Sequence, residues 1–546
     1  MNKKSLIGWL VAGMVGISIF CLLYRQALPT ASIDIRVSRQ EALKAAFNFI
    51  NKEGFNTEGF DYAVRFYSYY HGSVYLQKSV GIEKSNELIK KGIPIWFWRV
   101  KLFKELKKDS FIVDVNPSTG EVVNFYHFIL DTAKGDSLDK DTAYRIAVDK
   151  LKEKGIKLNE YSLMDSIKKV QKNRIDYTFV WEKKRFKINE ATLRIKVGIQ
   201  GSKLGSYVKY LDIPEEFLRR LEGDSYWGKV LYTASILSVF LLVVGAVFSF
   251  LLKPQAIDVK WKIPFFFGIL IILLKIMSFL NNFPLMWSFY SNTVSKSLFT
   301  AMSFQKTLVD AFYTGFMIFS FGTLGGITSK FALKRGWTLL DSEQAFSRSS
   351  SVISTLVVGY SLGFMFLGYV TLFYLVGGRF FNIWMAPSTG YANFLSTVFP
   401  FLYPLTFSLS AALNEEFMFR LFAITFLLRV VKKRWLVILI PSLLWGVAHS
   451  TYPVFPVYVR AIELTIFGII IGWVFVDYGI EAVIIAHYVM DALIVSLPLF
   501  NSKNYYFILS GVIVLLLVGL PLLLLLLRGK LSLSKKNRSS FELGRY

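Results

Sequence analysis

Long apolar runs constrain the fold of this chain more than any other feature. Each run is close to the length of about 20 residues that a helix needs to cross a bilayer. About ten runs occur, and they predict a polytopic, all-α membrane domain of about ten transmembrane helices. They lie near residues 5–24, 229–252, 263–281, 308–328, 353–377, 393–430, 435–452, 457–476, 481–499 and 507–527.

The region between the first two runs has a different composition. Only 18% of the 546 residues are charged, below the roughly 25% of soluble proteins, and many of these lie between residues 26 and 228. This contrast predicts a water-soluble domain inserted between the first and second membrane helices. The single cysteine, Cys21, excludes an intramolecular disulfide and any multi-cysteine metal site.

The net charge of +25 suits either a nucleic-acid binder or a membrane protein with basic cytoplasmic loops. Basic residues cluster beside the apolar runs, as at Lys3–Lys4 and at 432–434, which favours the bilayer as the partner and argues against nucleic acid. With ten crossings, these clusters fall on one side. We therefore expect a multi-pass protein of a bacterial cell membrane, with both termini cytoplasmic and residues 26–228 extracytoplasmic.

The soluble region contains an internal repeat. Ser38–Phe55 and Asp139–Ile156 align without gaps, and each begins with an N-capping residue type and ends near a glycine. Strand-like runs follow each predicted helix, with hairpin signals between 111–115 and 122–128 and between 193–199 and 207–211. A helix followed by antiparallel strands, repeated twice, predicts an α+β domain.

One segment of this region, Val113–Val123, reads VDVNPSTGEVV and resembles PepSY-like domains. That resemblance implies an inhibitory or binding module of the kind that accompanies secreted and membrane proteases. A generic α+β domain is the alternative.

The predicted organisation has five parts. They are an N-terminal anchor helix (1–25), the extracytoplasmic α+β domain with two PepSY-like repeats (26–228), membrane helices 2–4 with a cytoplasmic loop (229–352), a catalytic membrane domain (353–528) and a basic cytoplasmic tail (529–546).

Ionisable residues within membrane helices are costly and therefore suggest function. Two of the four histidines, His449 and His487, fall within apolar runs, and Glu415 and Glu416 fall within another. Glu416 and Arg420 are four residues apart and can pair on one helix face. Glu415 points about 100° away from them, which leaves it as the better candidate for chemistry.

Two further pairs repeat the four-residue spacing. These are Trp445 with His449, and His487 with Asp491. Counted from the basic turn at 432–434, Glu415 and His449 should lie at similar depth. His487 lies only about eight residues past the 477–479 turn, so the count places it nearer the cytoplasm, and the sequence does not resolve this mismatch.

These motifs resemble the CPBP family of type II CAAX prenyl proteases and bacteriocin-processing or immunity-related membrane proteins. EEFMFR fits the signature EExxxR, WGVAH fits FxxxH with tryptophan for phenylalanine, and HYVMD fits HxxxN with aspartate for asparagine. The three motifs occur in the expected order, and the resemblance covers roughly residues 355–500.

The resemblance implies roles for these residues. Glu415 and His449 would activate a water molecule, His487 and Asp491 would orient groups and stabilise the oxyanion, and Glu416, Arg420 and Trp445 would support them. The family is commonly classed as metalloproteases, so Glu415, His449 and His487 are also candidate ligands of Zn²⁺. The sequence has no HExxH motif and does not choose between a metal and a metal-free site.

Three functions compete. The first is an intramembrane endopeptidase that hydrolyses a membrane-associated or secreted peptide or protein. The second is a non-enzymatic bacteriocin-immunity, chaperone or regulatory protein. The third is a proton-coupled transporter, which the lack of a repeat among the membrane helices weakens. Four other features predict packing only: Lys275, the helix-surface pairs Lys306–Asp310 and Arg460–Glu463, and the GxxxG of Gly468 and Gly472.

Overall fold

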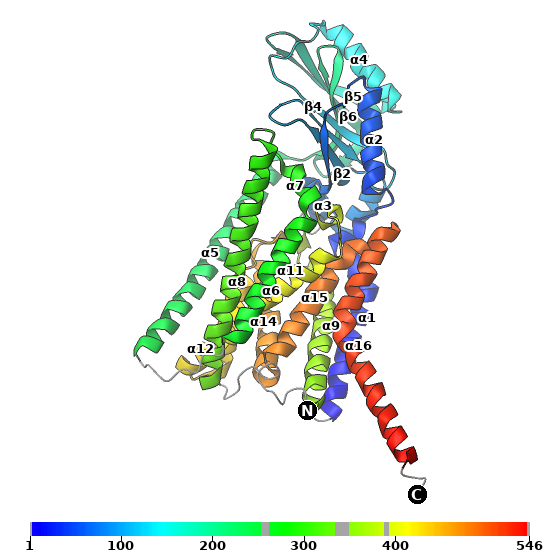
Figure 1. Cartoon of the computed structure of the whole chain (residues 1–546). Helices are drawn as coiled ribbons and strands as arrows, with labels where there is room; N and C mark the ends of the chain where they lie inside the picture. Colours follow the sequence, from blue (N-terminus) through cyan, green and yellow to red (C-terminus); the bar gives the residue numbers. More distant parts are fainter. Residues whose placement is uncertain (1–2, 253–260, 333–348, 387–392, 543–546) are drawn as a thin grey trace.

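The computed structural model describes residues 3–252, 261–332, 349–386 and 393–542. A bundle of long helices carries a β-sheet domain at one end, and both chain termini lie at the other end (Figure 1). The loop predicted near 333–348 lies outside the described residues.

Within the described residues, eight helices are long and apolar enough to cross a membrane. They are α1 (Lys3–Ala27), α5 (Glu215–Leu252), α6 (Lys262–Asn281), α8 (Lys296–Ala332), α9 (Ser349–Phe380), α14 (Tyr458–Tyr478), α15 (Ile480–Phe500) and α16 (Tyr505–Glu542). Each corresponds to one of the predicted apolar runs. The helical membrane-type architecture is confirmed, and the number of crossings stays a prediction.

The two remaining runs form shorter or divided helices. The run at 393–430 becomes η4 (Phe394–Ser396), α11 (Leu402–Glu415), a π-helical stretch labelled η5 (Glu416–Ile424) and α12 (Thr425–Val430). Pro404 lies in the first turn of α11, where a missing N–H leaves no hydrogen bond unmade, so it marks the start of the helix. The run at 435–452 forms α13 (Arg434–Val447), which has 14 residues.

The soluble region forms one antiparallel sheet of eight strands in the order β1-β2-β3-β4-β8-β7-β6-β5. Its elements are α2 (Arg39–Lys52), β1 (Asp61–Ser68), α3 (Tyr70–Lys90), β2 (Trp96–Phe103), β3 (Ser110–Val115), β4 (Val122–Phe128), α4 (Lys140–Glu153), β5 (Tyr161–Val170), β6 (Ile175–Ile188), β7 (Ala191–Gln200) and β8 (Lys203–Asp212). Each half contributes a four-stranded meander, and β4 pairs with β8 where the halves meet.

The local signals of the repeat appear in the structure. Ser38 caps α2 in a capping box with Glu41, and the side chain of Asp139 accepts a hydrogen bond from Thr142 N at the start of α4. Gly54 and Gly155 follow these helices with positive φ values of 80° and 71°, a conformation that favours glycine. Both predicted hairpins, β3–β4 and β7–β8, are confirmed.

Hydrogen bonds and ring contacts attach the sheet domain to the helices. The backbone N–H of Phe66 on β1 donates to Ser396 Oγ at 2.7 Å, and Arg39 Nη1 donates to Ser396 O at 2.8 Å. The rings of Trp98 and Phe507 stack at 6.4 Å. The sheet domain therefore sits directly on one end of the helix bundle.

Most of the residues predicted to serve packing lie at contacts between helices. A Cβ at Gly468 or Gly472 would come within 2.9 Å of Ser442 or 2.7 Å of Ile438, so the GxxxG motif marks the close contact of α14 with α13. Lys275 pairs with Asp310 across α6 and α8, at 2.6 Å. The predicted pairing of Asp310 with Lys306 is therefore wrong: the aspartate reaches the neighbouring helix instead of its own.

Candidate active site

Three separate segments of the chain meet around Glu415. Glu415 is the last residue of α11, Trp445 and His449 lie on and just after α13, and His487 and Asp491 lie on α15. The helix changes from α to π geometry directly after Glu415. Such π-helical insertions are frequent at functional sites.

The carboxylate of Glu415 faces three nitrogen atoms. Trp445 Nε1 donates a hydrogen bond to Glu415 Oε2 at 2.5 Å. The same oxygen lies 3.7 Å from His449 Nε2 and 3.9 Å from His487 Nε2. The last two distances are too long for direct hydrogen bonds, and one water molecule beside each pair of atoms can bond to both.

His449 is held by its own helix. Its Nδ1 lies 2.8 Å from the backbone oxygen of Trp445, one turn earlier. A carbonyl oxygen only accepts, so Nδ1 carries the proton and donates to it. In the neutral imidazole this leaves the lone pair of Nε2 directed toward Glu415.

The second glutamate belongs to a buried network. Glu416 Oε1 accepts a hydrogen bond from Arg420 Nη1 at 3.2 Å, and both side chains are almost fully buried. The same oxygen lies 2.8 Å from His487 Nδ1. The Arg420 guanidinium also lies 4.1 Å from the ring centre of Trp445. The sequence predicted the pairing with Arg420, but not the contacts to His487 and Trp445.

His487 links this network to Glu415. A carboxylate only accepts, so its Nδ1 donates to Glu416, while Nε2 lies 3.4 Å from Asp491 Oδ2. The predicted depth mismatch does not separate His487 from Glu415.

A second polar cluster lies within the same bundle. Arg460 Nη1 lies 2.7 Å from both carboxylate oxygens of Glu463, and the hydroxyl of Tyr374 donates to Glu463 Oε2. Glu463 is completely buried. The sequence predicted this pair on a helix surface. That placement is wrong, because spacing along one helix does not show which face other helices cover.

Two cavities reach Glu415. The smaller, of about 140 Å³, is lined by His449, His487 and Asp491, by the second polar cluster of Tyr374, Arg460 and Glu463, and by apolar side chains. The larger, of about 1020 Å³, lies among α6, α8 and α11, and its lining includes Lys275, Asp310 and Asn414. Glu415 and Tyr452 line both. The carboxylate is thus accessible from two directions.

The fit of a metal ion is limited by spacing. Two imidazole nitrogens and two carboxylates supply the chemical types that Zn²⁺ binds. In the parts of the chain that the structure describes, however, no three His, Cys, Asp or Glu side chains are close enough together to hold a metal. Zinc binding would require these groups to move closer, and zinc stays a prediction from the resemblance.

Comparisons with known proteins agree with this placement. Residues 397–493 match the family model described as type II CAAX prenyl endopeptidase Rce1-like. The chain is 23% identical over 521 residues to the sporulation-killing factor biosynthesis protein SkfC of Bacillus subtilis (strain 168), covering 92% of this chain and 97% of that protein. No solved structure matches the chain. All seven predicted site residues lie within 397–493, the segment that matches the type II CAAX prenyl endopeptidase Rce1-like family model.

Proposed function

We propose that the protein is an intramembrane endopeptidase that hydrolyses a peptide bond in a membrane-associated or secreted peptide. One observation carries the proposal: Glu415 Oε2 lies 3.7 Å from His449 Nε2 and 3.9 Å from His487 Nε2, at the wall of a cavity. The match to a peptidase family supports the reaction class.

In the proposed first step, one water molecule bridges Glu415 and His449. Two atoms 3.7 Å apart can each hydrogen-bond to a shared water. Glu415 takes a proton from this water while the oxygen of the water attacks the carbonyl carbon of the peptide. The new C–O bond gives a tetrahedral intermediate with a negative oxygen.

His487 is placed to stabilise that oxygen. Its Nδ1 donates to Glu416, and its Nε2 faces two further acceptors, Asp491 and Glu415. A protonated imidazole satisfies both sides and offers Nε2–H to the developing oxyanion. As the C–N bond breaks, Glu415 returns its proton to the leaving amine. Atoms and charges then balance to one carboxylic acid and one amine.

We further propose that the substrate is a peptide precursor. The name of the Bacillus subtilis relative assigns it to the biosynthesis of a sporulation-killing factor, and the similarity extends over nearly the whole of both chains. The family model concerns prenyl endopeptidases, so a prenylated peptide is the variant of this proposal.

The test compares the peptides released by cells that express the wild-type protein or Glu415→Gln. The expected result is at least one product whose formation falls about 10²- to 10⁴-fold in the variant, the usual contribution of a general base. Glutamine has the same shape, and its amide oxygen can still accept from Trp445, so folding should be unchanged. Equal product formation would contradict the peptidase proposal and favour the non-enzymatic alternative. Metal analysis of the purified protein tests the zinc prediction separately.

A further inference from the structure

The sheet of the soluble domain has two unlike faces. The helices α2 and α4 lie on one side of it (Figure 1), where buried residues such as Phe66, Trp98 and Phe125 form the core. The other face carries a cavity of about 510 Å³, a size typical of ligand sites. Side chains from both meanders line this cavity.

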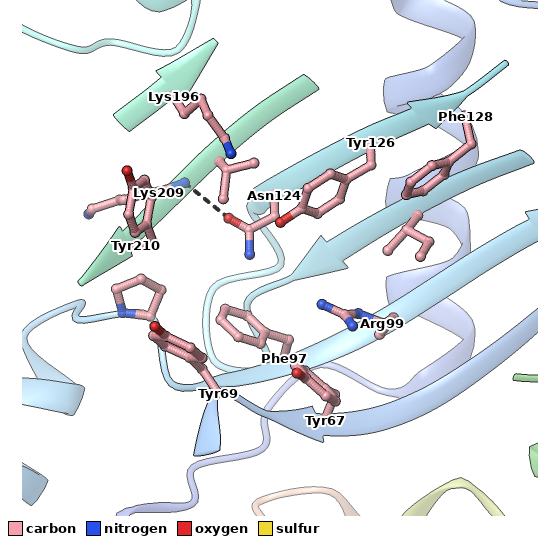
Figure 2. A pocket seen from close by; sticks show the side chains of 13 residues that line it. Tyr67, Tyr69, Phe97, Arg99, Asn124, Tyr126, Phe128, Lys196, Lys209 and Tyr210 are labelled. Atoms are coloured by element: carbon pink, nitrogen blue, oxygen red, sulfur yellow. Dashed lines mark hydrogen bonds between the residues drawn. The ribbon is translucent and has the colours of Figure 1, made fainter. Parts of the chain in front are cut away.

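Alternation along the strands directs aromatic rings into the cavity. Trp96 and Trp98 on β2 are in the core, so Phe97 and Arg99 between and beyond them point the opposite way. Figure 2 shows Tyr67, Tyr69, Phe97, Tyr126 and Tyr210 around one space. Rings with hydroxyl groups can pack against apolar side chains and also hydrogen-bond to a ligand.

Cations enter the same space from different strands. Figure 2 shows Arg99 on β2 and Lys196 on β7 both directed toward it. Arg99 is neutralised by the fully buried Asp114, through bonds of 2.7 and 2.8 Å. Lys196 has no carboxylate within 4.0 Å among the described residues.

Two more cations without a carboxylate partner in the described parts of the chain lie beside the cavity. The Arg65 guanidinium lies 5.0 Å from the ring centre of Tyr67, which lines the cavity, and 5.0 Å from that of Phe289. Lys101 donates to the backbone oxygen of Tyr290. Burial lowers the pKa of Arg65, and nearby Arg99 lowers it further. Burial and then Arg65 likewise lower the pKa of Lys101. An anion bound here would relieve both effects.

Arg65 also connects the sheet to the path toward Glu415. Phe289, which it contacts, lines the larger cavity of about 1020 Å³, and Glu415 lines that cavity too. A ligand held on the sheet would therefore lie close to one entrance of the candidate active site. Only an extended polymer could occupy both places at once.

We propose that the open face of the sheet binds an acidic segment of the polypeptide substrate, with carboxylates at Lys196 and Arg65 and apolar side chains on the tyrosine rings. This inference rests on the proposed function for the choice of a polypeptide. The charge complementarity and the position beside Phe289 are independent of it.

The test measures peptide binding to the full-length protein carrying Glu415→Gln, which keeps the peptide intact. The probes are a fluorescein-labelled peptide rich in aspartate, leucine and tyrosine, and the same peptide with asparagine in place of aspartate, followed by fluorescence anisotropy. We expect the acidic peptide to bind more tightly, with an affinity that falls as salt rises.

Three variants locate the binding site. Lys196→Gln should weaken binding of the acidic peptide about three- to fivefold and reduce its salt dependence, as expected for loss of one solvent-accessible charge pair. Lys196→Arg keeps the positive charge and should bind the acidic peptide like the parent. Lys168→Gln is the matched control on β5, where the side chain is exposed and lies outside the cavity, and it should bind like the parent.

Any of three results would overturn the inference. They are equal affinity for the two peptides, no binding of either, and equal effects of Lys196→Gln and Lys168→Gln. Vesicles of anionic phosphatidylglycerol that bind through Lys196 when the peptide does not would assign the face to lipid instead. Cleavage by the wild-type protein is measured separately, so failure of the peptidase proposal and failure of the binding proposal give different results.

Discussion

Two buried polar clusters within the predicted membrane helices differ in how completely their carboxylates are bonded. Both oxygens of Glu463 lie 2.7 Å from Arg460 Nη1, one also accepts from Tyr374, and the side chain is fully buried. Glu415 has a single short hydrogen bond, from Trp445, and 21% of its side chain is exposed to a cavity.

This difference suggests a structural role for Glu463 and a catalytic role for Glu415. A charge in an apolar interior is stable when partners surround it, and both oxygens of Glu463 are already bonded to Arg460 or Tyr374. Glu415 instead faces two imidazoles at distances that suit a shared water. Ion pairing alone would not have distinguished the two glutamates, since both have cationic or potentially cationic neighbours.

The largest effect that sharpens this comparison is on stability. Glu463→Gln leaves Arg460 buried without its ion-pair partner and should reduce the free energy of unfolding by about 3–5 kcal/mol. Thermal or denaturant unfolding in detergent micelles measures it. Replacing both residues, with Arg460→Met and Glu463→Leu, should recover part of the loss. If Glu463→Gln had normal stability but no longer cleaved the substrate, Arg460 and Glu463 would take part in the reaction.

The next effect concerns the partner of His487. Asp491→Leu removes the acceptor 3.4 Å from Nε2 and should reduce the rate of cleavage about ten- to hundredfold, the value of a hydrogen bond to a charged group. Asp491→Asn keeps an acceptor oxygen and restores the residue usual in the motif, so it should lose less than tenfold. Cleavage rates for the two variants show whether His487 needs an acceptor oxygen or a negative charge beside it. Equal losses would show that the charge itself is required.

A smaller effect tests the tryptophan that departs from the usual motif. Trp445→Phe keeps an aromatic ring beside Arg420 but removes the N–H that donates to Glu415. Loss of about 1 kcal/mol of hydrogen bonding should slow cleavage about fivefold with little change in stability. An unchanged rate would show that the indole N–H does not position the carboxylate.

The smallest expected effect is on the stability of the soluble domain. It concerns Lys154, a partly buried cation outside the predicted membrane helices that has no carboxylate bonded to it in the described residues. Lys154 lies 4.4 Å from the ring centres of Phe49 and Tyr207, and burial lowers its pKa to about 8. The unfolded chain, with a lysine pKa of about 10.4, binds more protons between these values, so stability rises with pH from about 8 to 10. Below pH 8 the cost of the buried charge is fully present.

Lys154→Met should therefore stabilise the soluble domain by about 1 kcal/mol at pH 7, and the gain should shrink by pH 9.5. Hydrogen exchange of α4 and β8 in the full-length protein measures this change. A gain that does not depend on pH would assign the effect to packing instead of charge.

Local signals explain what could be predicted from the sequence. The caps at Ser38 and Asp139, the two hairpins and the i, i+4 pair of Glu416 and Arg420 each depend on residues that are near one another in the chain. Apolar runs likewise mark helices without knowledge of their neighbours. These features were predictable because short-range geometry alone determines them.

Features that depend on packing were not predictable. The contact of His487 with Glu416 joins two helices far apart in the chain, and no periodicity in the sequence indicates the π geometry of η5. The buried position of Glu463 depends on which helices surround α14. In β2, the sequence WFWRVKLF places large apolar residues on both faces, so alternation could not separate the core face from the face with Arg99.

The central claim is that Glu415, His449 and His487 direct one water molecule at a peptide bond. Hydrolysis in water enriched in oxygen-18, followed by mass spectrometry of the product, tests it most directly. The account predicts one oxygen-18 atom in the new C-terminal carboxylate with the wild-type protein and a nearly complete loss of this product with Glu415→Gln. Unlabelled product, or labelled product formed equally fast by the variant, would contradict it.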